Sequence, residues 1–238
     1  EKIDFKDFKL IIICAFFGMG LNMITALNGL YNSTPINSAI ITTLAPIFIF
    51  IISVFLLKEK ITKIKYLGVF IGFIGTLTLI LLNEKSIANA PNINLGNFYF
   101  FINSLSYAIY FVLVKPLTKK YSMITIMKWL FLFSIIINMP FGLLEFTEIN
   151  WVEISRNSLI KISYVVFCTT FLVYLLNLYA LKNLKASTVG MFIYLQPVIG
   201  ILFAIYRGAD KLTIADISSV IMVFAGVYLV SKRSTQIT

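Results

Sequence analysis

The sequence predicts an all-α protein that crosses a membrane several times, and three observations lead to this fold class. Of the 238 residues, 59% are hydrophobic and only 13% are charged, and the mean hydropathy is +0.93. A soluble domain carries roughly a quarter charged residues, so lipid must be the solvent of this chain. Eight apolar stretches reach the length of about 20 residues that a membrane-spanning helix needs. Several of these stretches also recur at one constant offset along the chain.

The eight predicted transmembrane helices are separated by mostly short connections, so neighbouring helices should pack antiparallel. The helices are expected at residues 8–30, 35–57, 64–82, 97–114, 124–144, 159–181, 186–206 and 214–230. The connection at residues 83–95 is longer and polar, and it contains Pro91. It is predicted to be the linker between a first unit, residues 1–82, and a second unit, residues 96–238.

The net charge of +10 indicates a membrane surface rather than a nucleic acid, because the twenty Lys and Arg residues lie in short runs between apolar stretches. With the N-terminus placed in the cytoplasm, fifteen of the twenty fall in cytoplasmic segments, and the opposite side holds Lys85, Arg156, Lys161, Arg207 and Lys211. Positive residues accumulate on the cytoplasmic side. We therefore expect both termini in the cytoplasm and an integral protein of a bacterial cytoplasmic membrane.

Enzymatic and metal chemistry are not expected. The chain has no histidine, and its two cysteines, Cys14 and Cys168, lie inside apolar stretches as predicted free thiols. A membrane-embedded enzyme would need a group of His, Asp or Glu side chains, and no ionisable residue lies at the centre of an apolar stretch. The sequence predicts no metal, no cofactor and no catalytic residue. A multi-pass membrane enzyme and a non-transporting structural bundle both stay open as alternatives at this point.

An internal repeat is the most informative feature. Adding 151 to the residue number pairs Pro46 with Pro197 and Glu59 with Asp210, and it maps the first three helices onto the last three. Under the loop assignment the paired helices run in opposite directions, so the repeat is inverted and predicts a site near the midplane. Residues 96–151, with two helices, have no partner. We therefore expect two five-helix units, ten helices in all, with two helices before Glu1: residues 1–82 would hold helices 3–5, and residues 96–238 helices 6–10.

Two stretches carry a family resemblance. Residues 28–65 read N-G-L-Y-N-S-T-P, L-A-P and L-L-K-E-K-I-T in order, and residues 178–213 read L-Y-A-L, Y-L-Q-P-V and G-A-D-K-L-T. The chain resembles the EamA-like ten-helix transporters of the drug/metabolite transporter superfamily. It departs from that pattern at Lys58, where glycine is usual, and at Asp210, which replaces a glutamate. The resemblance implies efflux or exchange of small metabolites such as amino acids, their derivatives or drugs.

The candidate binding site consists of polar and aromatic side chains that share helix faces at spacings of i, i+4 and i+7. The predicted substrate-binding residues are Asn22, Thr25, Thr43, Asn103, Tyr107, Tyr110, Tyr174, Asn177, Tyr194 and Gln196. Pro46 and Pro197 are the candidate gating hinges, since proline removes a backbone hydrogen bond. For each residue alone, an interhelical hydrogen bond or a packing kink is an equal alternative.

Two further features are expected to be structural. Gly68, Gly72 and Gly75 predict a close helix contact, either within the subunit or across a homodimer. Glu59 is expected to favour the N-terminus of the helix that follows it. The expected partners are a small-molecule substrate and the lipid bilayer, with no nucleic acid. Together the sequence predicts an exporter or exchanger of a neutral or zwitterionic, amino-acid-like or drug-like molecule, working by alternating access.

Overall fold

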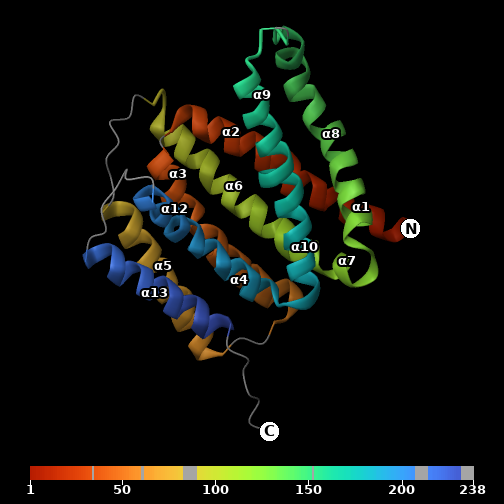
Figure 1. Cartoon of the computed structure of the whole chain (residues 1–238). Coiled ribbons are helices and arrows are strands. Elements are labelled where there is room, and N and C mark those ends of the chain that lie inside the picture. Colours follow the sequence, from red (N-terminus) through yellow and green to blue (C-terminus); the bar gives the residue numbers. More distant parts are fainter. Residues whose placement is uncertain (34, 60–61, 83–89, 152, 207–213, 232–238) are drawn as a thin grey trace.

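The computed structural model describes residues 1–33, 35–59, 62–82, 90–151, 153–206 and 214–231, and among these residues the regular structure is entirely helical (Figure 1). The first rod joins α1 (Phe5–Ala15), the π-helix η1 (Phe16–Leu21) and α2 (Asn22–Asn32). It is followed by α3 (Pro35–Thr42), α4 (Leu44–Leu57) and α5 (Lys63–Leu82). The middle of the chain forms α6 (Ile93–Leu113), α7 (Lys115–Lys120) and α8 (Met123–Glu148).

The last third of the chain has the same pattern of elements as the first. A second rod joins α9 (Arg156–Tyr164), the π-helix η2 (Val165–Leu172) and α10 (Val173–Asn183). It is followed by α11 (Ala186–Met191), the 3-10 turn η3 (Phe192–Tyr194), α12 (Leu195–Tyr206) and α13 (Ile214–Ser231). Each of the eight predicted helices is present, with ends within a few residues of the expectation. The all-α fold class is therefore confirmed.

The helices have the length and composition of an integral membrane protein. Five helical runs in the described residues are long and apolar enough to span a bilayer: Phe5–Asn32, Asn37–Leu57, Ile93–Lys120, Met123–Leu143 and Arg156–Asn183. Ala186–Ile199 and Ile217–Val230 are shorter apolar helices. Many large apolar side chains face outward, which a water-soluble protein avoids and a bilayer accommodates.

Two helices are interrupted shortly before a proline. The helix that begins at Pro35 has a turn at Thr43, between α3 and α4, and the helix that begins at Ala186 narrows to a 3-10 turn at η3. Pro46 and Pro197 follow these breaks, and proline has no N–H to donate to the carbonyl four residues earlier. The prolines were predicted as hinges; the structure places a helix break beside each of them, and their role in gating stays a prediction.

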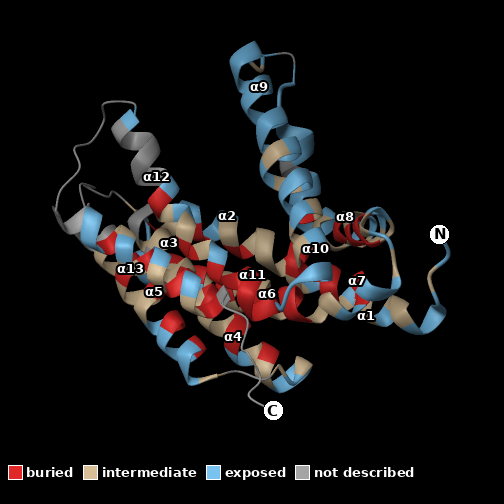
Figure 2. Cartoon of the chain, turned by 60° about the horizontal axis from the view of Figure 1, so that its bottom comes forward, coloured by how far each residue is buried: buried red, intermediate tan, exposed pale blue. Residues whose placement is uncertain are grey.

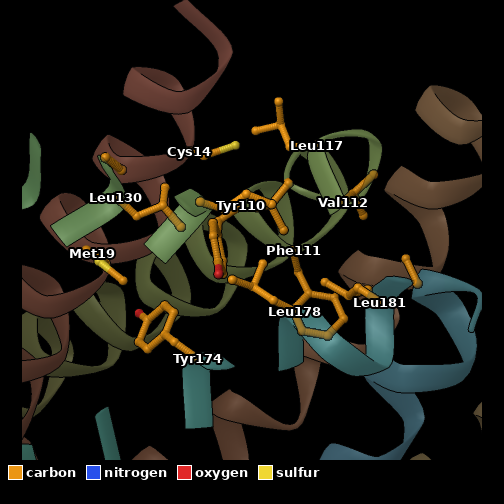
Figure 3. Packing of buried hydrophobic residues seen from close by; sticks show 14 of the residues in the cluster. Cys14, Met19, Tyr110, Phe111, Val112, Leu117, Leu130, Tyr174, Leu178 and Leu181 are labelled. Carbon is orange, nitrogen blue, oxygen red and sulfur yellow. The ribbon is translucent and has the colours of Figure 1, made fainter. Parts of the chain in front are cut away.

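The hydrophobic core lies where α1, η1, α6, α8 and α10 meet (Figure 3). The ring of Tyr110 packs against Gly18, where a Cβ atom would lie only 2.5 Å from the ring. The Tyr174 hydroxyl donates a hydrogen bond to the Gly18 carbonyl, and the two tyrosine rings lie 5.7 Å apart. The π-helical turn at η1 thus brings bare backbone against two aromatic rings, a local irregularity of the kind often found near functional sites.

The predicted glycine contact lies within the chain, between α5 and α13, which run side by side (Figure 1). A Cβ atom at Gly68 would meet the Gly226 carbonyl oxygen at 2.9 Å, and one at Gly75 would meet the Ser219 carbonyl oxygen at 3.0 Å. Gly226 and Ser219 are the residues that the offset of 151 assigns to Gly75 and Gly68. The contact is thus reciprocal, as in a pair of helices related by a two-fold axis, and this glycine face is already occupied by α13.

One end of the bundle carries the lysine-rich connections, and α7 holds it together. Lys120 forms an ion pair with Asp7 in α1, with 2.9 Å between Nζ and Oδ2. Lys115 donates hydrogen bonds to the carbonyl oxygens of Leu181, at 3.0 Å, and of Leu184 at the end of α10. We refer to this region as the basic end. Both 28-residue rods are anchored there, α1 by its first turn and α10 by its last.

Glu59 also acts at the basic end, where it binds a helix that is distant in the sequence. Its carboxylate accepts a hydrogen bond from the Ala186 N–H, at 2.9 Å, and one from the Ser187 hydroxyl. It therefore caps the N-terminus of α11, and its expected effect on α5, which follows it in the chain, stays a prediction. A carboxylate at a helix N-terminus satisfies free N–H groups and complements the helix dipole. Its predicted counterpart, Asp210, lies outside the described residues.

Candidate substrate-binding site

The larger of two neighbouring pockets lies between α6, α10 and the interrupted helix α11–η3–α12. Its volume is about 400 Å³. The lining consists of apolar, aromatic and amide side chains, with no charged residue among them: Tyr107, Phe111, Val173, Leu176, Asn177, Ala180, Leu184, Val189, Phe192, Ile193 and Gln196. An uncharged cavity of this size, mostly apolar with a few polar groups, is typical of a site for a small organic molecule.

The polar feature of the larger pocket is a hydrogen bond between two of its walls. The Asn177 side-chain amide donates to the Tyr107 hydroxyl at 3.0 Å, which joins α10 to α6. The Tyr107 ring also packs against Phe111, with ring centroids 5.4 Å apart. Asn177 retains its amide oxygen as an acceptor, and Tyr107 retains its O–H as a donor. The pair therefore offers both a hydrogen-bond donor and a hydrogen-bond acceptor to a bound molecule.

The smaller pocket lies where the two helix breaks face each other, and its volume is about 170 Å³. Its lining is Ala39, Thr42, Thr43, Ile193, Tyr194, Gln196 and Pro197. Ile193 and Gln196 line both pockets, so the two spaces adjoin. Tyr194 is fully buried, and its hydroxyl has no hydrogen-bond partner in the described structure.

Five of the ten predicted binding residues line these pockets. Tyr107, Asn177 and Gln196 line the larger, and Thr43, Tyr194 and again Gln196 line the smaller. Tyr110 and Tyr174 are instead buried in the core beside the larger pocket, where Tyr110 is entirely inaccessible to solvent (Figure 3). Of the two predicted hinges, Pro197 lines the smaller pocket, and Pro46 is buried nearby in α4.

The remaining three predicted residues, Asn22, Thr25 and Asn103, line neither pocket. Asn22 donates to the Asn103 carbonyl at 3.2 Å, and Asn103 donates to the Asn22 carbonyl at 2.7 Å. Thr25 donates back to the Leu21 carbonyl within its own helix. The asparagine pair thus makes the interhelical hydrogen bonds that the sequence allowed as an alternative, each worth about 0.6 kcal/mol. A role in substrate binding stays a prediction for these three residues.

Sequence reasoning missed the apolar walls of the larger pocket. Val173, Ala180 and Leu184 lie four residues before, three after and seven after Asn177, and so share its helix face. Phe111 lies one turn after Tyr107 in the same way. Following these faces outward from the polar residues would have found the walls. Phe192 and Val189 carried no comparable signal, because they lie on a helix whose break was not located from the sequence.

The comparison with known families gives one match that covers most of the chain. The EamA-like transporter family matches residues 1–81 and 94–232. An uncharacterized transporter of Archaeoglobus fulgidus is 28% identical over 98% of this chain and 81% of its own length. The uncharacterized transporter YetK of Bacillus subtilis is 26% identical over 84% of this chain, which spans 60% of YetK. A WAT1-related protein of Arabidopsis thaliana is 26% identical over 97% of this chain and 67% of its own length.

A solved crystal structure has a similar fold. It aligns with a TM-score of 0.77 over 93% of this chain and 75% of the other chain, at 14% sequence identity. At that identity the likeness concerns the fold alone.

Proposed function

The chain belongs to the EamA-like transporter family, and we propose that it moves a small neutral or zwitterionic organic molecule across the membrane by alternating access. The observation that carries this proposal is the uncharged pocket of about 400 Å³ with the Asn177–Tyr107 pair in its wall. A multiply charged solute would lose its hydration there without a counter-charge. A solute with an apolar portion would gain contact with Phe111, Leu176 and Phe192.

Transport rather than catalysis is supported by the chemistry of the two pockets. Neither lining contains Asp, Glu, Lys, Arg, His or Cys, so the Thr and Tyr hydroxyls in these linings have no neighbouring base there to activate them as nucleophiles. What the pockets offer is hydrogen bonding and apolar contact. Those interactions bind and release a molecule without changing it.

The proposed mechanism uses two inverted units, residues 1–82 and 96–238, joined by residues 83–95. Two facts support this division. The helical rods Phe5–Asn32 and Arg156–Asn183 begin and end at the offset of 151, and the α5–α13 glycine contacts are reciprocal under the same offset. Inverted units related by an axis in the membrane plane exchange their conformations between the two membrane faces. The smaller pocket has Thr42 and Thr43 on one side and Ile193 and Tyr194, their partners under the offset, on the other.

We propose that the basic end faces the cytoplasm of a bacterial cell and that its contacts close the pathway there. The bonds from Glu59 to α11 and from Lys115 to the end of α10 connect four helices at this end. Leu184, whose carbonyl Lys115 contacts, lines the larger pocket. Opening toward the cytoplasm would require these hydrogen bonds to separate. Exporter and exchanger both fit this arrangement, and both termini would be cytoplasmic.

The test is flux in proteoliposomes that contain the purified protein. Vesicles would be loaded with a mixture of neutral and zwitterionic metabolites, and the released compounds identified by mass spectrometry against protein-free vesicles. Asn177→Ala should weaken transport of the released compounds by roughly five- to hundredfold, because a buried polar partner is lost. Asn183→Ala is the matched control, since Asn183 is exposed and, within the part of the chain that the structure describes, donates to the Tyr179 carbonyl in its own helix. Release of no compound above the protein-free level would contradict the proposal.

A further inference from the structure

The hydrogen bonds from Glu59 to the start of α11 join two units that alternating access must move against each other. Lys58 ends α4 in the left-handed conformation, with a φ of 50°, and Glu59 follows it in the first unit. The Glu59 carboxylate accepts from the Ala186 N–H and the Ser187 hydroxyl in the second unit. Because the acceptor is charged, each of these bonds is about twice as strong as a neutral one. A charged contact therefore ties the two units together at the basic end.

The start of α11 depends on this carboxylate because the residue before it supplies no cap. That residue is Lys185, which makes no side-chain hydrogen bond to the first turn, and a lysine side chain has no acceptor. The Lys65 and Lys115 ammonium groups also attract the Glu59 carboxylate, and Lys65 is only 5% exposed. Removing the charge of Glu59 would therefore weaken its interactions with α5, α7 and α11 at once.

The internal repeat does not provide the same pair of donors at the opposite end of the bundle. Under the offset of 151, the partners of Ala186 and Ser187 are Pro35 and Ile36 at the start of α3. Proline has no N–H and isoleucine has no hydroxyl, so neither of the two donors that Glu59 uses has an equivalent there. The contact is consequently a property of one end, although the two units are repeats of each other.

The start of α3 has instead the residue types of a helix that is capped locally. Thr34 lies outside the described residues, but threonine is a cap-forming residue type, and the proline that follows it needs no acceptor. Beside this point, the Ser33 hydroxyl at the end of α2 donates to the Asn97 amide oxygen in α6, at 2.7 Å. That hydrogen bond also joins the two units, and it is neutral. The contacts at the starts of α3 and α11 therefore differ in charge.

We infer that Glu59 sets the conformational equilibrium of the transporter and holds its resting state closed at the basic end, an inference that rests on the transport function proposed above. Two identical units related by an axis in the membrane plane would give the two open states equal free energies. A contact that forms only when one end is closed shifts the equilibrium toward that state. Glu59 is thus a positioning residue: it contacts α11, whose Val189 lines the larger pocket, and not the bound molecule.

The experiment measures how fast two cysteine reporters react with a water-soluble maleimide in lipid nanodiscs, where both ends of the protein are accessible. Val189→Cys, at a position that is 8% exposed in the larger pocket, reports on the basic end. Ser38→Cys, its partner under the offset of 151, lies in α3 and reports on the opposite end. Cys14 and Cys168 are replaced by alanine in both reporters. Labelling needs no substrate, so the result is independent of whether flux is found.

Glu59→Gln keeps the size of the side chain and removes its charge. We expect the Val189→Cys reporter to react faster and the Ser38→Cys reporter to react more slowly. The ratio of the two rates follows the equilibrium between the two states and should rise roughly tenfold or more. Ser187→Ala removes one of the two donors and should move both rates in the same directions by less. Glu148→Gln, the same change at an exposed carboxylate, should leave both rates unchanged.

The direction of the two rates separates a conformational role of Glu59 from a structural one. A loosened fold would raise both rates together, and that result would overturn the inference, as would unchanged rates in Glu59→Gln or an equal effect in Glu148→Gln. If Glu59→Gln does not fold, Ser187→Ala decides by the same criterion. Opposite changes of the two rates in a protein without flux would contradict only the transport proposal, whereas flux with both rates raised would leave that proposal standing.

Discussion

The rods α1–η1–α2 and α9–η2–α10 are alike in sequence pattern and unlike in burial. Both have 28 residues, both are strongly apolar, and both contain a π-helical stretch. Yet 39% of the most apolar stretch of Phe5–Asn32 is buried, and only 6% of that of Arg156–Asn183. None of the described residues of α9 and η2 is buried, and Figure 2 shows α9 standing away from the bundle.

Identical residues at equivalent positions make the difference sharper. Ile11 in α1 is fully buried, whereas Ile162, its partner under the offset of 151, is 48% exposed. The order reverses further along the rods, where Leu27 in α2 is 68% exposed and its partner Leu178 in α10 is fully buried. The buried members, Ile11 and Leu178, lie in α1 and α10, which are the parts of the two rods anchored at the basic end. Burial therefore depends on the end of the molecule and on the neighbouring helices, not on the repeat or on the type of residue.

The largest effect we predict tests this comparison with one substitution at both positions. Ile11→Ala should lower the free energy of unfolding by about 2–5 kcal/mol, because it leaves a cavity in a packed core. Ile162→Ala should change it by less than about 0.5 kcal/mol, since its side chain faces outward and lipid is as apolar as the side chain. Reversible chemical unfolding in lipid–detergent micelles would measure the free energy of unfolding of both variants.

The leucine pair serves as the control for that prediction. Leu178→Ala should strongly lower the free energy of unfolding, and Leu27→Ala should change it little. In this pair the costly substitution lies in the second rod, whereas in the isoleucine pair it lies in the first. If both substitutions in the first rod were costly and both in the second were mild, burial would follow the repeat and the comparison would fail. A costly Ile162→Ala would mean that this face of α9 packs against protein.

The sequence could predict the helices and their register because apolar length and spacing are local properties. It could not predict which of Ile11 and Ile162 is buried, since that depends on α6 and α8 lying along the first rod. Glu59 illustrates the same limit: its bonding partners Ala186 and Ser187 are more than a hundred residues away, so a local rule could not have found them. Of the site, the polar residues Tyr107 and Asn177 could be found from their helix faces, whereas the break that shapes the smaller pocket could not be located.

A second prediction concerns the anchor of the second rod at the basic end. Lys115→Met keeps the length of the side chain but removes the ammonium group that binds the Leu181 and Leu184 carbonyls. Because a cation satisfies the last carbonyls of a helix and complements its dipole, we expect a loss of about 1.5 kcal/mol in unfolding free energy. Lys119→Met, at an exposed position in the same helix, should have no comparable effect. Equal losses for the two variants would show that total positive charge, not this contact, stabilises the basic end.

The smallest effect is expected at the anchor of the first rod. Asp7→Asn removes the ion pair with Lys120, whose side chain is 57% exposed, and exposed ion pairs contribute little because water and salt screen them. The difference from the parent should be small at low ionic strength and should disappear at 1 M salt, where the Debye length falls to about 3 Å. The free energies of unfolding of Asp7→Asn and Lys115→Met, each compared with the parent across a series of salt concentrations, measure the contributions of both anchors. The hydrogen bond from Lys115 to the Leu181 carbonyl is partly buried, so its contribution should persist in high salt. The contrary outcome is that the Asp7 contact still contributes to the free energy of unfolding at high salt and the Lys115 contact does not. The second rod would then not be the more firmly anchored of the two, and its low burial would mark a loosely held helix.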